Sequence, residues 1–144
     1  MNKDKLVFLK PKKENQLGQW LIEQGVSAGF PSPADDFKEV RISLDKELIK
    51  NTESTFYARV SGDSMENAGL SDGDLIVIDR SINPENNKIA VCLIDGEFTV
   101  KRIVKKGGII YLKPENKNYK EIKLEAMDDF KVWGVVTYVI KSIN

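Results

Sequence analysis

The chain has 144 residues, 41% of them hydrophobic, which is the length of one domain and enough to bury a sizeable core. Its 22 basic and 22 acidic residues balance, so no net charge draws the protein to nucleic acid or to an anionic membrane surface. A single cysteine, Cys92, excludes an internal disulfide, and no apolar run approaches the roughly 20 residues of a membrane span, so we expect a cytoplasmic protein.

Residues 1–28 form a polar segment with scattered apolar side chains. Leu17, Trp20 and Leu21 predict one face of a short helix that ends at Gly25. Because too few apolar side chains are present to bury a core, we interpret the segment as an arm that docks on something else. Trp20 and Leu21 would either anchor this arm or form a loosely packed helix face.

A proline-containing linker is predicted over residues 29–37. Pro31 and Pro33 keep the chain extended, because each proline restricts its own φ and disfavours the α region in the preceding residue. Ala28-Gly29 lies directly before these prolines and combines small residues in a loop-like segment, where a chain is readily cut.

From about residue 38 to residue 144 the pattern is mostly that of β-strands, rich in β-branched and aromatic residues. The expected strands cover residues 56–60, 75–78, 89–94, 98–104, 109–112 and 133–140. Asp95-Gly96 predicts a tight hairpin between two of them, and Lys106-Gly107-Gly108 predicts another turn. The expected fold is mainly β, a curled antiparallel sheet or partly open barrel with an extended N-terminal arm.

The chain contains no histidine, which excludes Ser-His-Asp and Cys-His catalysis and any His-ligated metal site. The remaining route to nucleophilic hydrolysis pairs a serine with a neutral lysine. Ser64 follows a predicted strand beside Gly62, where small residues let a substrate approach and where its backbone N–H is a candidate oxyanion donor. Lys101 lies in an apolar-rich strand, where burial would favour its neutral form.

Each of these residues also has a plainer interpretation. A serine in a turn and a lysine in a strand are common, and by pattern alone the plainer interpretation, a turn hydroxyl and a solvated charge, is favoured over catalysis. Cys92 is interpreted as a small buried hydrophobic residue. Asp72-Gly73-Asp74 resembles part of a metal loop but lacks the further oxygen ligands that calcium needs, so we expect a turn and no metal.

Four blocks of the sequence carry a resemblance to a known family, in order and with compatible spacing. They are Gly29-Phe30-Pro31-Ser32-Pro33-Ala34, Ser61-Gly62-Asp63-Ser64-Met65, Leu70-Ser71-Asp72-Gly73-Asp74-Leu75 and Asp95-Gly96-Glu97-Phe98-Thr99-Val100-Lys101. Together they resemble the UmuD group of the LexA-type self-cleaving serine peptidases, over about residues 26 to 140.

The resemblance implies roles for individual residues and for partners. Ser64 would be the nucleophile, Lys101 the general base, and Ala28-Gly29 the scissile bond, with no cofactor. Cleavage would follow contact with RecA filaments on single-stranded DNA, as part of the SOS response to DNA damage. The trimmed form would join a Y-family translesion polymerase of the UmuC type, and homodimers are usual in this family.

The same reasoning separates this chain from related classes. A LexA-type repressor needs a helix-turn-helix domain of about 60 residues before the cleavage site, so with 28 residues before Gly29 we expect no sequence-specific DNA binding. A signal peptidase would need a membrane anchor. The alternative of a different class is a β-rich interaction module without proteolysis, which regulates a polymerase or RecA; the presence of Ser64, Lys101 and Ala28-Gly29 together favours the peptidase.

Overall fold

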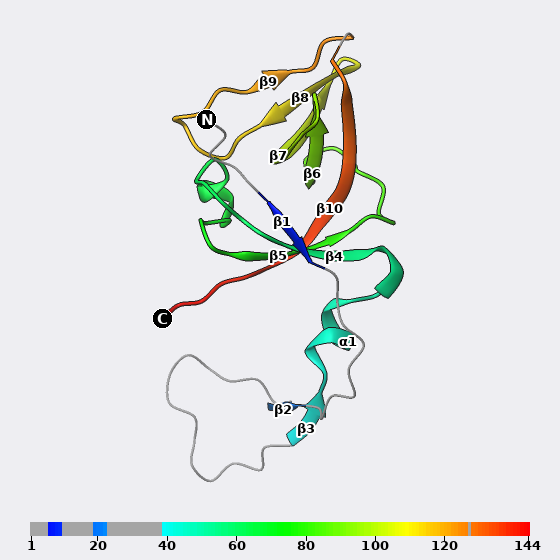
Figure 1. Ribbon diagram of the computed structural model, residues 1–144, viewed down its shortest axis with the longest axis vertical. Helices are drawn as coiled ribbons and strands as arrows, with labels where there is room; N and C mark the ends of the chain where they lie inside the picture. The colour runs from blue at the N-terminus through cyan, green and yellow to red at the C-terminus, as the bar shows by residue number, and fades with distance from the viewer. Residues whose placement is uncertain (1–5, 10–18, 23–38, 127) are drawn as a thin grey trace. The chain divides into compact units, whose positions relative to one another are not determined.

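The computed structural model describes residues 6–9, 19–22, 39–126 and 128–144 (Figure 1). The chain divides into two compact units: a smaller one over residues 12–50, and a larger one made of residues 1–11 and 51–144. No helix in these described ranges is long and apolar enough to cross a membrane.

The smaller unit contains a two-stranded antiparallel sheet and one short helix. Strand β2 (Gln19–Ile22) pairs with β3 (Glu39–Ile42), and helix α1 (Leu44–Leu48) follows, with the Ser43 side chain as its N-cap. The helix predicted around Trp20 is therefore wrong over Gln19–Ile22. A helix of one or two turns is unstable on its own in water, whereas a run of Trp, Leu and Ile suits a strand once a partner strand is available.

The larger unit is built on one antiparallel sheet of eight strands, in the order β1-β4-β5-β10-β6-β7-β8-β9. The strands are β1 (Val7–Leu9), β4 (Thr55–Arg59), β5 (Leu75–Asp79), β6 (Ile89–Ile94), β7 (Glu97–Lys106), β8 (Ile109–Lys113), β9 (Ile122–Lys123) and β10 (Phe130–Ile140). Short 3-10 turns η1 (Thr52–Ser54) and η2 (Glu66–Ala68) flank β4 and its following loop. The mainly β, antiparallel class predicted from the sequence is confirmed.

Two tight hairpins set the register of β6, β7 and β8. Ile94 pairs with Glu97 across Asp95-Gly96, and Lys106 pairs with Ile109 across Gly107-Gly108. All four turn residues have positive φ, from 47° at Asp95 to 83° at Gly96. Two-residue turns with positive φ match the right-handed twist of paired strands. Glycine adopts positive φ without steric cost, which explains why it stands at three of the four positions.

Strand β10 crosses the sheet between its two sides. Its first half, from Phe130 to Val135, pairs with β6, and its second half, from Val135 to Ile140, pairs with β5. The register shifts by one residue in each half, and such irregularities bend a strand and increase its local twist. Figure 1 shows β10 running along the length of this unit.

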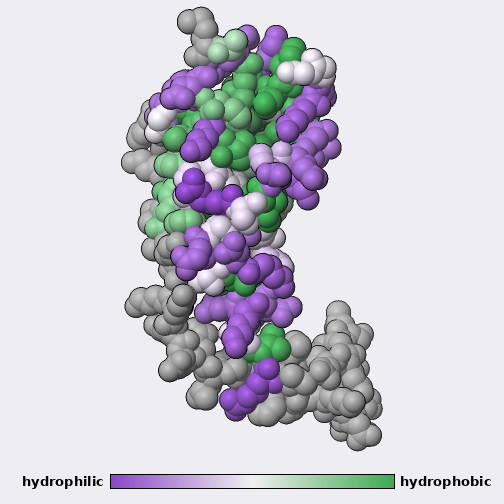
Figure 2. Space-filling view, turned by 90° about the vertical axis from the view of Figure 1, so that its right-hand side faces the viewer, coloured by the Kyte–Doolittle hydropathy of each residue, from purple (hydrophilic) through white to green (hydrophobic). Residues whose placement is uncertain are grey.

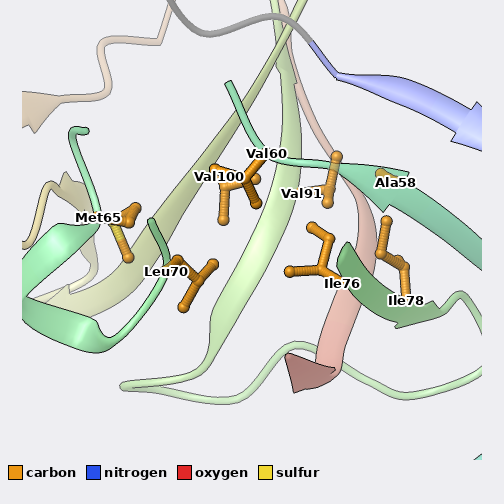
Figure 3. Packing of buried hydrophobic residues seen from close by; sticks show 8 residues of the cluster. All are labelled: Ala58, Val60, Met65, Leu70, Ile76, Ile78, Val91 and Val100. Carbon is orange, nitrogen blue, oxygen red and sulfur yellow. The ribbon is translucent and has the colours of Figure 1, made fainter. Parts of the chain in front are cut away.

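Buried hydrophobic residues form two clusters, and alternate residues of β6 point into one or the other. Val91 belongs to the first cluster, whereas Ala90 and Cys92 belong to the second, as the two-residue period of a strand requires. The first cluster is drawn in Figure 3 and consists of Ala58, Val60, Met65, Leu70, Ile76, Ile78, Val91 and Val100. Figure 2 shows hydrophobic residues gathered on the upper part of one face, with hydrophilic residues along its borders.

Strand β1 contributes an aromatic side chain to the first cluster. The Phe8 ring lies 4.6 Å from the Trp133 ring and 4.9 Å from the Phe98 ring, centroid to centroid. Phe56 packs on Trp133 at 5.0 Å, and the Arg80 guanidinium lies 4.5 Å from the centroid of the same indole. Tilted and edge-on ring pairs of this kind stabilise a fold beyond the area that they bury.

Asp79, at the end of β5, should stabilise the fold through its carboxylate, and this contribution should be lost in acid. Burial raises the pKa of its carboxyl, but hydrogen bonds from Ser81 and Ser54 to the carboxylate outweigh this and hold the pKa below its ordinary value. Because the folded pKa is depressed, the contribution is present above the unfolded pKa of about 3.9 and is lost as the pH falls through the folded value. We expect Asp79→Asn to flatten the fall in unfolding free energy below about pH 4, measured by urea titration at several pH values. An unchanged slope would contradict this assignment.

Candidate active site

Ser64 lies in the loop between β4 and η2, in a position that nearby backbone contacts define. Val60 N–H donates to the Asp74 carbonyl at 2.8 Å, and Gly73 N–H donates to the Val60 carbonyl at 2.8 Å. Gly62, with a φ of 96°, then turns the chain, and its N–H donates to the Asp72 carboxylate at 2.9 Å. Asp72 thus holds the loop that carries Ser64. This gives a structural role to one of the two acids of Asp72-Gly73-Asp74.

Lys101 lies in the middle of β7 with its amine directed at Ser64. Its Nζ is 3.1 Å from Ser64 Oγ, 2.7 Å from Thr99 Oγ1 and 3.1 Å from the Val100 carbonyl oxygen. Thr99 shares the face of Lys101 because side chains two apart on a strand point the same way. The structure therefore brings together two residues that are far apart in the sequence, in hydrogen-bond contact.

The pair is withdrawn from solvent. Ser64 is 4% exposed and Lys101 is 5% exposed. Burial of a lysine favours its neutral form, and a neutral amine is the form that accepts a proton. Such an arrangement can activate a hydroxyl as a nucleophile without any histidine.

A small pocket opens beside the Ser64 side chain. Its lining is mainly apolar and consists of Leu6, Val60, Ser61, Gly62, Ser64, Met65 and Val100. Met65 is 2% exposed and also belongs to the first core cluster, so it both lines the pocket and packs in the core. The pocket suits a small apolar side chain and excludes a charged one, which would lose its hydration there.

Residues 20–137 match the family model described as Peptidase S24-like. This chain belongs to the peptidase S24 family.

Individual S24 relatives agree with this assignment. The chain is 37% identical over 130 residues to protein ImpA of Salmonella typhimurium, a match that covers 90% of this chain and 88% of ImpA. It is 38% identical over 136 residues to protein SamA of Salmonella typhimurium strain LT2, covering 94% of each. It is also 35% identical over 130 residues to the LexA repressor of Shewanella denitrificans, covering 90% of this chain and 62% of the repressor. ImpA and SamA are UmuD-like proteins, so the predicted resemblance is confirmed.

Not every predicted site residue of this S24 chain falls within the described structure. Ala28 and Gly29, the predicted cleavage site, lie outside the described residues, as do the rest of residues 23–38. The linker prediction over residues 29–37 lies there as well. Within the described ranges, no group of three or more Asp, Glu, Cys or His side chains is placed to hold a metal ion.

Cys92 is not a candidate nucleophile. It is fully buried in the second core cluster, and this burial raises the pKa of its thiol to about 12. The thiolate is the reactive form of cysteine, so a thiol with this pKa is inert near neutral pH.

Sequence reasoning missed a loop that contacts the Ser64 segment. Residues 114–121, the β8–β9 loop, bring Asn116 and Tyr119 to Asp63, the residue before Ser64. Pro114, Asn116 and Asn118 are typical of a loop in sequence. Nothing in that pattern indicates a contact with a residue more than 50 positions earlier, since such a contact depends on how the intervening strands are arranged in the fold.

Proposed function

We propose that this chain is a self-cleaving serine endopeptidase of the SOS response that cuts its own Ala28–Gly29 bond. Ser64 is the nucleophile and Lys101 is the general base. Cleavage is stimulated by RecA filaments, and the trimmed homodimer acts in the cytoplasm as an accessory subunit of a UmuC-type Y-family translesion polymerase. The observation that carries the peptidase proposal is the buried 3.1 Å contact between Lys101 Nζ and Ser64 Oγ.

The partners of the Lys101 amine support its role as a base. A neutral amine keeps one lone pair, which can accept a hydrogen bond from a neighbouring hydroxyl. The Val100 carbonyl is only an acceptor, whereas the hydroxyls of Ser64 and Thr99 both donate and accept. The Val100 carbonyl therefore accepts from the amine, and we infer that Thr99 Oγ1 accepts from it as well, so that the Ser64 O–H donates to the lone pair when the amine is neutral.

In the proposed acylation step, Ser64 Oγ forms a bond to the carbonyl carbon of Ala28 while its proton passes to Lys101 Nζ. The Ala28–Gly29 C–N bond then breaks, and Lys101 delivers the proton to the nitrogen of Gly29, which leaves as a new N-terminus. In the second step Lys101 takes a proton from water, and the resulting hydroxide attacks the ester. As the ester bond breaks, Lys101 returns this proton to Ser64 Oγ and so restores the hydroxyl, while Ala28 leaves as a carboxylic acid that loses its proton to water.

Two further features support this substrate. The apolar pocket beside Ser64 suits the methyl group of Ala28. The backbone N–H of Ser64 makes no hydrogen bond to another described residue, which leaves it available to the developing oxyanion. One such donor typically contributes a factor of about 10²–10³ to the rate.

The place of the reaction in the cell rests on the relatives. ImpA and SamA are UmuD-like and the LexA repressor is a further S24 relative, so a role in the response to DNA damage extends to this chain by similarity. The polymerase and RecA are proposed as partners on the same basis.

Cleavage at high pH tests the proposal directly. Purified protein held at pH 7 and at about pH 10 should release a fragment of residues 29–144, faster at the higher pH, because a lysine of ordinary pKa, about 10.4, becomes increasingly neutral over this range. Intact-mass spectrometry follows the fragment with time, with RecA filaments added at pH 7 in a parallel series. A chain that stays intact in every series would contradict the peptidase and favour an interaction module.

A further inference from the structure

The β8–β9 loop is hydrogen-bonded to both elements that carry the serine and the lysine. On the serine side, Asn116 and Tyr119 bond Asp63, and Asn67 N–H donates to the Glu115 carbonyl at 2.7 Å. On the lysine side, Arg102 Nε donates to the Glu115 carboxylate at 2.5 Å. The loop thus contacts the residue just before Ser64 and the residue just after Lys101.

Asn116 is the most enclosed polar side chain of this loop. It is 9% exposed. Its Nδ2 donates to the Asp63 carbonyl at 2.8 Å, and its Oδ1 accepts from Asn118 N–H at 3.0 Å. Since both ends of the amide are bonded, its orientation is determined, and the donor faces the loop of Ser64.

The Asp63 carbonyl that Asn116 holds belongs to the same peptide unit as the Ser64 N–H. A peptide unit is planar, and in the trans form its C=O and N–H point in opposite directions. No described peptide bond is cis. The Asp63 carbonyl accepts from Asn116 and also from Glu66 N–H at 3.1 Å, so the plane cannot rotate without losing both bonds.

We propose that Asn116 is a positioning residue for self-cleavage, which sets the peptide plane of Asp63–Ser64 and so aims the Ser64 N–H at the oxyanion. This inference rests on the proposed function. Asn116 touches neither substrate nor the reacting atoms; it acts through the Asp63 carbonyl. Asn116 therefore helps to stabilise the tetrahedral intermediate, and it does not alter proton transfer by Lys101.

Tyr119 offers a comparison within the same loop. Its hydroxyl contacts the Asp63 carboxylate at 2.5 Å, which is a contact with the side chain and does not hold the peptide plane. Asn118 is exposed, and its backbone N–H, not its side chain, bonds Asn116. Asn118→Ala is therefore a matched control that removes an amide from the same loop and keeps the contact.

The test compares first-order self-cleavage rates of the full chain between about pH 7 and about pH 10. The variants are Asn116→Asp, which keeps the shape but replaces the donor by an acceptor, and Asn116→Ala, which removes the donor without adding charge. We expect both to lower the rate about 10- to 100-fold at every pH, since small errors in the placement of a donor have effects of this size. The midpoint of the pH profile should stay where it is in the wild type, and Asn118→Ala should cleave at the wild-type rate.

Several outcomes would overturn the inference while leaving the peptidase in place. One is a folded Asn116→Ala that cleaves within twofold of the wild type. Another is a displaced pH midpoint with an unchanged rate at high pH, which would place the effect on Lys101. A third is loss of rate only in step with a lowered thermal midpoint in both variants, which would make Asn116 a residue of fold stability. If the wild type itself does not cleave, the proposed peptidase function is wrong. That outcome differs from a wrong role for Asn116, in which the wild type still cleaves.

Discussion

Neither Ser64→Ala nor Lys101→Ala should release the 29–144 fragment at a measurable rate. Under the proposed mechanism, removal of Ser64 Oγ takes away the attacking atom, and removal of Lys101 Nζ leaves the hydroxyl without the proposed base, which lies 3.1 Å from it. Loss of either member of a nucleophile–base pair commonly lowers the rate by about 10⁴-fold or more. Intact-mass spectrometry of the two variants, held at about pH 10 beside the wild type, measures this effect.

Matched controls distinguish the pair from a general effect of alanine substitution. Lys106→Ala removes an exposed lysine from the end of the same strand, and Ser142→Ala removes an exposed serine near the C-terminus. Both should cleave at the wild-type rate. If RecA filaments accelerated Lys101→Ala as strongly as the wild type, Lys101 would not be the base. A double variant should be no slower than either single one, because the two residues act as a unit.

Gly134→Ala should be the most destabilising small substitution in the sheet. A Cβ at this position would lie 2.5 Å from Ile78 Cγ2, which real Cβ atoms do not tolerate, and 3.3 Å from Arg80 Cγ. Ile78 is fully buried and cannot move without displacing the first core cluster. Overpacking of this kind costs about 1–3 kcal/mol or somewhat more. In a chain of this length, a loss of about 3 kcal/mol lowers the thermal midpoint by about 10 °C.

A double-mutant cycle assigns this effect to the contact with Ile78. Ile78→Ala alone leaves a cavity and should also destabilise the fold. Combined with Gly134→Ala, the added methyl group occupies part of that space, so the double variant should unfold more easily than the wild type but less easily than the sum of the single effects predicts. Strict additivity, measured by urea unfolding, would mean that the strain at Gly134 comes from elsewhere.

Most of the sheet could be predicted because its signals are local. Asp95-Gly96 and Gly107-Gly108 determine their turns through backbone conformations that glycine adopts easily, and the β-branched runs on either side supply the strands. Each of the six predicted strands corresponds to an observed strand with ends that differ by a few residues at most. Ser64 and Lys101 could be singled out because histidine is absent and because their motifs resemble those of a family.

The remaining features depend on contacts between distant parts of the chain. Trp20 and Leu21 adopt a strand because β3, about 20 residues later, supplies a partner. Asn116 and Tyr119 reach Asp63 only because the fold brings the β8–β9 loop beside the Ser64 loop. The two-residue period of a strand places Thr99 beside Lys101, but its 2.7 Å hydrogen bond to the amine depends on side-chain conformations that no sequence pattern specifies.

The order of strands has a consequence for when the protein can react. Ser64 follows β4, which lies on one side of β10 in the sheet, whereas Lys101 belongs to β7 on the other side. Strand β10 hydrogen-bonds to both β5 and β6, and so the hydroxyl and the amine meet only when both of its edges are paired. The distance between Ser64 Oγ and Lys101 Nζ therefore depends on whether β10 is paired with both β5 and β6. Under the proposed function, a chain in which β10 is not paired with both β5 and β6, during synthesis or after partial unfolding, does not hold Ser64 beside Lys101 and should not cleave itself.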